Sequence, residues 1–72
     1  MKHSASVKVN GVERELPFAM IGAEEIIGSA LGLVKDPGAF VVSYKIGDRE
    51  GRVLPSERMV PEDGMEFTVS PR

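Results

Sequence analysis

The chain contains no cysteine, no tryptophan and a single histidine, His3, among its 72 residues. Without thiols it can form neither a disulfide nor a cysteine-ligated metal centre, two supports that small domains often use. A histidine-based metal site needs further convergent ligands, and His3 lies near the N-terminus, where chains are commonly poorly ordered. We therefore expect no metal, no cofactor and a domain stabilised by packing and backbone pairing alone.

Two further features are missing, an excess of one charge and a long apolar run. Nine Lys and Arg residues stand against eleven Asp and Glu residues, giving a net charge of -2. Nucleic-acid surfaces need clustered positive charge, so we expect no nucleic-acid partner. The longest apolar runs, such as Phe18–Ile21, are far shorter than the roughly 20 residues that span a membrane, and no signal-peptide pattern follows Met1. The sequence predicts a soluble, cytoplasmic protein without a membrane partner, and we expect a monomer.

What remains is the composition of one small folded domain. Hydrophobic residues make up 42% of the chain and charged residues 28%, which is too apolar a mixture for intrinsic disorder. No repeat and no linker interrupts the sequence. We therefore expect one domain over residues 1–72, ordered from about residue 4 to residue 71.

The start of the chain predicts a β-hairpin. Two runs of alternating polarity, Ser4–Val9 and Val12–Phe18, flank Asn10-Gly11, a dipeptide typical of tight hairpin turns because both positions require φ > 0. A two-residue turn would pair Val7 with Arg14 and place an arginine on the apolar face. A bulged turn would shift this register, and the sequence leaves the two alternatives open.

Residues 23–31 have the pattern of an amphipathic helix. Gly22 is an acceptable N-cap, and Glu25 stands at the third helical position, where the helix dipole favours a carboxylate. Gly32 suits the position just after the helix, and Leu33 suits the hydrophobic contact that often follows it. The apolar stripe predicted to face the core consists of Ile26, Ile27, Ala30, Leu31 and Val34.

Three more strands are predicted after a turn at Asp36-Pro37-Gly38. Ala39–Ile46 alternates most clearly, Gly51–Leu54 is short and stopped by Pro55, and Met65–Ser70 closes the chain. The inward side chains are expected to be Phe40, Val42, Tyr44 and Ile46 in the first strand, Met65, Phe67 and Val69 in the last, and Met59 and Val60 as anchors between them. Such a chain forms a mixed sheet with one helix packed across it, an α+β fold.

No motif carries a catalytic pattern. The adjacent acids Glu24-Glu25 and Glu62-Asp63 resemble acid–base pairs, but neighbouring helical side chains point apart, and helix starts and turns favour acids for structural reasons. The glycine spacing around Ser29 is not that of a nucleophile elbow, and the chain has no second histidine to act as its base. We expect that the protein is not an enzyme.

The order of these elements resembles the β-grasp of ubiquitin-like proteins over nearly the whole chain. The residues that carry the resemblance are Val9-Asn10-Gly11-Val12, Glu24-Glu25-Ile26-Ile27 with Gly32-Leu33, and Glu62-Asp63-Gly64-Met65-Glu66-Phe67. These V-N-G, G-L and D-G-x-x-F segments are similar to those of bacterial multi-ubiquitin-type domains. The resemblance implies a bacterial protein modifier, or a unit of a multi-ubiquitin-type chain, handled by activating, conjugating and deubiquitinating-type enzymes.

The C-terminal residues depart from the pattern of that family. Ubiquitin-like modifiers end in glycine, because an unhindered terminal carboxylate must be adenylated and passed to a thiol. Here the last strand leads directly to Pro71 and Arg72, the end that would adjoin any conjugation tail. We expect either that a glycine tail belongs to the encoded protein, or that the chain is a non-conjugated ubiquitin-like protein–protein interaction module.

The recognition face also departs from that of ubiquitin, which presents an apolar patch on the exposed side of its third and fifth strands. Only one of the corresponding positions here is apolar, so readers of ubiquitin's patch should bind this face poorly. The face is either an ordinary solvated side of a sheet or a polar docking surface for a dedicated partner. Its candidate residues are Val41, Ser43, Lys45, Thr68 and Ser70.

Overall fold

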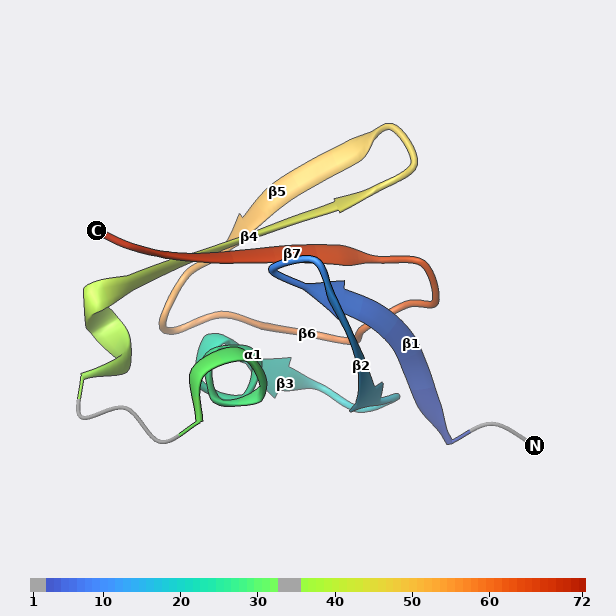
Figure 1. The fold of residues 1–72 in the computed structure, drawn as a ribbon, viewed down its shortest axis with the longest axis horizontal. Helices are drawn as coiled ribbons and strands as arrows, with labels where there is room; N and C mark the ends of the chain where they lie inside the picture. The colour runs from blue at the N-terminus through green and yellow to red at the C-terminus, as the bar shows by residue number, and fades with distance from the viewer. Residues whose placement is uncertain (1–2, 33–35) are drawn as a thin grey trace.

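A five-stranded mixed sheet forms the body of the protein in a computed structural model that describes residues 3–32 and 36–72 (Figure 1). The strand order is β2-β1-β7-β4-β5, and every neighbouring pair is antiparallel except the parallel pair β1 and β7. Strands from the two ends of the sequence therefore lie side by side near the centre of the sheet. Its strands are β1 (Ser4–Val9), β2 (Val12–Pro17), β4 (Phe40–Ile46), β5 (Arg49–Val53) and β7 (Glu66–Pro71).

The N-terminal hairpin takes the tighter of the two registers that the sequence leaves open. Asn10 and Gly11 both have positive φ, 53° and 80°, and form a two-residue turn. Val7 consequently lies opposite Arg14. The arginine is nevertheless exposed, because β2 is an edge strand and only its Leu16 is buried.

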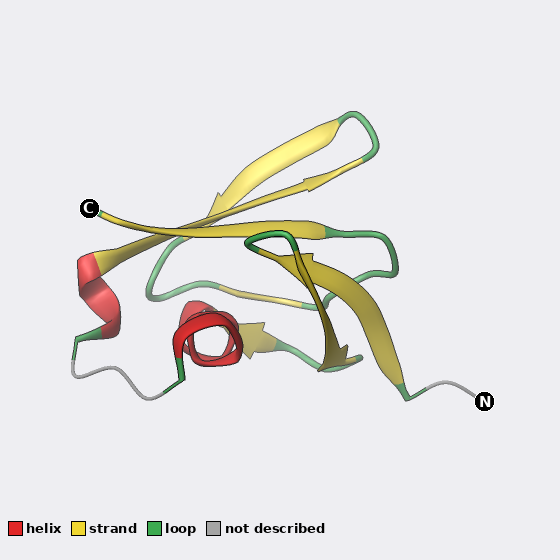
Figure 2. Cartoon of the chain, viewed as in Figure 1, coloured by secondary structure: helices red, strands yellow, loops and turns green. Residues whose placement is uncertain are grey.

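One α-helix, α1 (Ala23–Leu31), lies across one face of the sheet and has the predicted bounds (Figure 2). At its start, the Gly22 backbone N–H donates a hydrogen bond of 2.9 Å to Oε2 of Glu25, a capping contact in addition to the predicted dipole interaction. At its end, the Gly32 N–H donates to the Gly28 carbonyl. The expected core role of Leu31 is wrong: its side chain is 46% exposed, at the last residue of the helix. The predicted contact of Leu33 and the stripe position Val34 lie outside the described residues.

The chain re-enters the sheet through a short 3₁₀ turn, η1 (Pro37–Ala39). The Asp36 carboxylate accepts a hydrogen bond from the Gly38 N–H, and the Asp36 carbonyl accepts one from the Ala39 N–H. The predicted turn is confirmed. Because Ala39 belongs to this turn, β4 begins one residue later than expected.

The strand β5 begins earlier than the sequence pattern indicates. Gly47 has a φ of 59°, and the tight turn at Gly47-Asp48 lets Arg49 pair directly with Ile46. The charged residues Arg49 and Glu50 therefore join the strand. Leu54, expected to be its last residue, follows the strand and is exposed.

A second, two-stranded sheet was not predicted. It pairs β3 (Ile21–Gly22) with β6 (Arg58–Met59), with Ile21 opposite Met59. Met59 packs against the core as expected, but Val60 does not and is 46% exposed. Because neighbouring residues of an extended segment point to opposite sides, the second buried side chain of this segment is that of Pro61.

The core lies between the helix and the sheet. The inward orientation predicted for the last strand is confirmed, since Met65, Phe67 and Val69 are all buried. Phe40, Tyr44 and Ile46 are partly buried and pack against the core, while Val42 is fully enclosed. Within residues 3–32 and 36–72, no helix has the length and apolarity needed to cross a membrane. The buried set consists of Ala5, Val7, Val9, Leu16, Ile21, Ala23, Ile26, Ile27, Val42, Val53, Met65, Phe67 and Val69.

Candidate interaction face

The side of the sheet that faces away from α1 carries the predicted face. Val41 pairs with Ser70 and Ser43 with Thr68 across β4 and β7. Because directly opposed residues point to the same side of a sheet, and the intervening Val42 and Val69 are buried, these side chains point outward. Lys45, two residues after Ser43, lies on the same side and is exposed. The structure thus brings all five predicted residues to one surface, and their role in binding stays a prediction.

Charges of alternating sign cross this face in a single row, which we call the charge row. On β1, Lys8 is opposite Glu13 of β2 on one side and Glu66 of β7 on the other. Lys45 is likewise opposite Glu66 on one side and Glu50 of β5 on the other. Opposite charges on neighbouring strands favour pairing by about 0.2–1 kcal/mol each, less where the side chains are exposed, as these are. The charge row consists of Glu13, Lys8, Glu66, Lys45 and Glu50.

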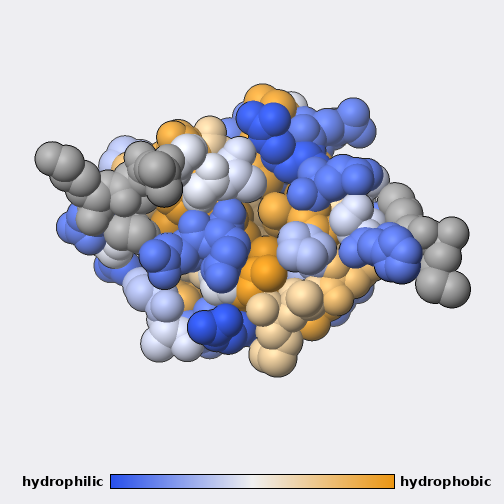
Figure 3. Space-filling model, turned by 90° about the horizontal axis from the view of Figure 1, so that it is seen from below, coloured by the Kyte–Doolittle hydropathy of each residue, from blue (hydrophilic) through white to orange (hydrophobic). Residues whose placement is uncertain are grey.

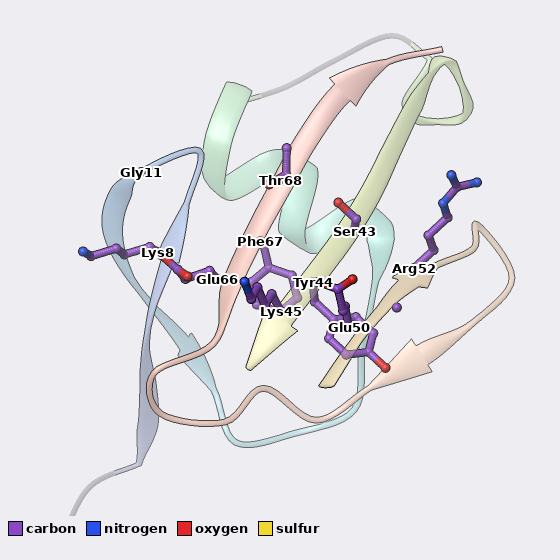
Figure 4. Close-up of a pocket in the computed structure, with 11 residues that line it drawn as sticks. Lys8, Gly11, Ser43, Tyr44, Lys45, Glu50, Arg52, Glu66, Phe67 and Thr68 are labelled. Carbon is purple, nitrogen blue, oxygen red and sulfur yellow. The ribbon is translucent and has the colours of Figure 1, made fainter. Parts of the chain in front are cut away.

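An open depression of about 550 Å³ lies over β1, β7, β4 and β5. Figure 4 shows Glu66 between Lys8 and Lys45 along its lower part, with Thr68 and Ser43 above them. Hydroxyl groups, carboxylates and ammonium groups all line this depression, so it offers donors and acceptors of both charges. Such a surface suits a polar partner surface better than an apolar one.

Sequence reasoning missed most of the charge row. Glu66 is two residues before Thr68 in the same strand and therefore points to the same side, so alternation alone could have placed it on the face. Lys8 could not be placed, because no sequence pattern shows that β1 pairs in parallel with β7. Glu50 was missed because β5 was expected to begin only at Gly51 and its register with β4 was unknown.

The opposite side, which bears the helix, is less uniformly polar. Figure 3 shows this side with apolar areas interspersed among hydrophilic ones. Phe18 and Met20, in the connection from β2 to β3, are 44% and 64% exposed. The register of β3 with β6 places Met20 level with Val60, which is also exposed. The two sides of the molecule therefore differ in polarity, and the open sheet face is the polar one.

Apart from the exposed Glu24, the residues first considered for catalysis are engaged in structural contacts. Both carboxylate oxygens of Glu62 lie 3.2 Å from Nη2 of Arg49, and Oδ1 of Asp63 accepts a hydrogen bond of 2.8 Å from the Ser6 N–H. Glu25 caps the helix, and the Ser29 hydroxyl donates to the Ile26 carbonyl. Across the described ranges 3–32 and 36–72, no three His, Cys, Asp or Glu side chains gather closely enough to hold a metal ion.

The last strand carries the chain to the surface. The Arg72 N–H donates a hydrogen bond of 2.9 Å to the Ala39 carbonyl, so β7 stays attached to the start of β4 up to its last residues. Pro71 and Arg72 are both exposed. The marked C-terminus lies at the opposite end of the molecule from the start of β1 (Figure 1).

No protein-family model, no curated protein and no solved structure matches the chain.

Proposed function

We propose that this chain is a ubiquitin-like β-grasp protein that acts as a protein modifier or as a unit of a multi-ubiquitin-type chain. The sheet topology carries the proposal: the hairpins β1–β2 and β4–β5 flank the central strand β7, which runs parallel to β1, and one helix crosses a single face. This is the arrangement expected of a β-grasp, and it leaves the other face of the sheet available to partners. Those partners are activating, conjugating or deubiquitinating-type enzymes.

The direction of β7 supports a role in conjugation. Pro71 and Arg72 are exposed, and the strand leads away from the core. A tail that follows Arg72 would extend into solvent, where the active site of an activating enzyme can enclose it. The proposal therefore requires the encoded protein to carry, or to be matured to, a C-terminal glycine.

The test is adduct formation by the full-length gene product. Incubated with its cognate activating enzyme and ATP, it should form an adduct that reducing thiols release, as expected for a thioester. A variant with the residues after Arg72 deleted is the matched control and should form none. Absence of any adduct from the folded full-length protein would exclude the modifier role.

A second candidate function is that of a non-conjugated interaction module. The charge row favours it, because a surface of alternating charge selects a partner whose charges are complementary. Under this alternative, Lys45→Glu should weaken partner binding, while the intact mass of the cellular protein should show no conjugate. A modifier should instead appear in cells as covalent adducts of higher mass. The two measurements together separate the candidates.

A further inference from the structure

We propose that two copies of this chain pair antiparallel along the free edge of β5, which joins their sheets into one. The pairing does not depend on the proposed function, because it rests on the sequence and register of β5 alone. It replaces the expectation of a strict monomer with that of a weak, symmetric dimer.

The edge of β5 is available for pairing. Among the described residues, β5 has β4 as its only partner strand, and it lies at the margin of the sheet (Figure 1). An edge strand presents backbone N–H and C=O groups that a further strand can bind. In β5 only Val53 is buried, so its edge is not enclosed by other side chains.

A two-fold axis midway between Gly51 and the Gly51 of a second copy makes β5 complementary to itself. A two-fold axis perpendicular to the sheet keeps outward side chains outward, and directly opposed residues point to the same side of a sheet. The axis must therefore lie midway between two copies of the same residue. With the axis at Gly51, all five residues of β5 overlap, and Glu50 lies opposite Arg52 of the second copy. Symmetry repeats this pair, so the interface contains two opposite-charge pairs on the outer face.

Both members of this pair are free to form it. Within residues 3–32 and 36–72, neither Glu50 nor Arg52 makes a side-chain hydrogen bond or an ion pair. The third charge of the strand, Arg49, is already bound to Glu62 at 3.2 Å. Glu50 also ends the charge row beside Lys45, so Arg52 of the second copy would continue the alternation of charge across the joint.

The other edge of the sheet, β2, is not complementary to itself. The same operation on β2, with the axis at Arg14, places Glu13 opposite Glu15 of the second copy and repeats this repulsion by symmetry. Pro17, at the end of β2, also lacks the N–H that a ladder needs. Like charges and proline are the usual protection of an edge strand, and β2 has both.

The residue on the axis permits close approach. Gly51 has no side chain, and the ring of Tyr44 lies over it on the inner face, where an added Cβ would come within 2.9 Å of Tyr44 Cζ. Tyr44 is the only tyrosine of the chain. Its ring signals therefore report on events at the centre of the β5 edge.

Association should be weak. Interfaces that bury less than roughly 1,200 Å² of surface are typically transient, and one pair of strands buries far less than this area. Sedimentation velocity from micromolar to millimolar protein should show an average mass that rises with concentration towards that of a dimer. Over the same range, the Tyr44 ring resonances should shift with concentration.

Charge reversal provides the sharp test. Glu50→Arg places Arg opposite Arg, and Arg52→Glu places Glu opposite Glu, so each variant alone should remain monomeric at concentrations where the wild type associates. An equimolar mixture of the two should regain association. In a mixed dimer, both arginines of the Glu50→Arg copy lie opposite glutamates of the Arg52→Glu copy. The double variant E50R/R52E should also associate as the wild type does.

Glu24→Arg is the matched control, because it makes the same charge change at an exposed position on the helix, away from both edges of the sheet, and should leave association unchanged. Circular dichroism and thermal unfolding of every variant verify that it is folded. The proposal is overturned by a wild type that stays monomeric throughout, by a folded E50R that associates normally, or by a mixture that stays monomeric.

Discussion

At the scale of single residues, Asn10 combines two roles. Its positive φ of 53° forms the hairpin turn, and its side chain extends the pairing between β1 and β7 beyond the end of β1. Oδ1 accepts a hydrogen bond of 2.8 Å from the Val69 N–H, while Nδ2 donates one of 3.1 Å to the Val69 carbonyl. The amide thus takes the place of a backbone peptide group. The sequence predicts the turn from Asn-Gly, but the contact with Val69 depends on a pairing that no local pattern reveals.

Replacing Asn10 separates the two roles. Asn10→Gly keeps the positive φ and removes both side-chain hydrogen bonds, so we expect a loss of about 1–3 kcal/mol in the free energy of unfolding. Asn10→Ala should lose roughly 1–2 kcal/mol more, because alanine is strained in the left-handed region. Urea denaturation measures both changes. Wild-type stability of Asn10→Gly would mean that the amide contacts with Val69 contribute nothing.

At the scale of elements, the helix and strands were predicted well where residues close in the sequence determine their ends, and poorly where distant pairing does. The helix has its predicted bounds because Gly22, Glu25 and Gly32 act within a few residues of its ends. The strands β3 and β6 were missed because two residues carry no periodicity, and their pairing joins segments far apart in the sequence. The start of β5 was missed because the tight turn at Gly47-Asp48, rather than apolar alternation, determines where it begins.

The cap of α1 gives a prediction at this scale. Glu25→Ala removes the carboxylate that accepts the Gly22 N–H and should lower the free energy of unfolding by about 0.5–2 kcal/mol. Glu24→Ala is the matched control: it lies in the same first turn, is exposed and loses only its interaction with the helix dipole, about 0.3–1 kcal/mol. Thermal unfolding compares the two variants. Equal losses would show that the dipole, rather than the hydrogen bond, accounts for the effect of Glu25.

At the scale of the whole molecule, the parallel pair β1 and β7 determines both the fold and the candidate face. It places Lys8 beside Glu66 and Val9 beside Phe67, residues at opposite ends of the sequence. Alternation within strands was enough to predict which side chains point outward, including all five predicted face residues. The order of the strands was needed to see that their charges form one row, and that order arises from packing of the complete chain.

Phe67 tests how far this central pair supports the molecule. Its side chain is 2% exposed and is among the largest that are fully buried, while its carbonyl accepts a hydrogen bond from the Asn10 N–H. Phe67→Ala should lower the free energy of unfolding by about 3–5 kcal/mol, because it leaves a cavity in the core. Since small proteins have a free energy of unfolding of only about 5–15 kcal/mol, this loss should lower the thermal midpoint severely or unfold the domain at room temperature.

Val12→Ala, at a half-exposed apolar position in β2, is the control and should change stability by no more than about 0.5 kcal/mol. If Phe67→Ala melted at the temperature of the wild type, Phe67 would not occupy the centre of the core, and the outward orientation of Thr68 and Ser70 would be wrong with it.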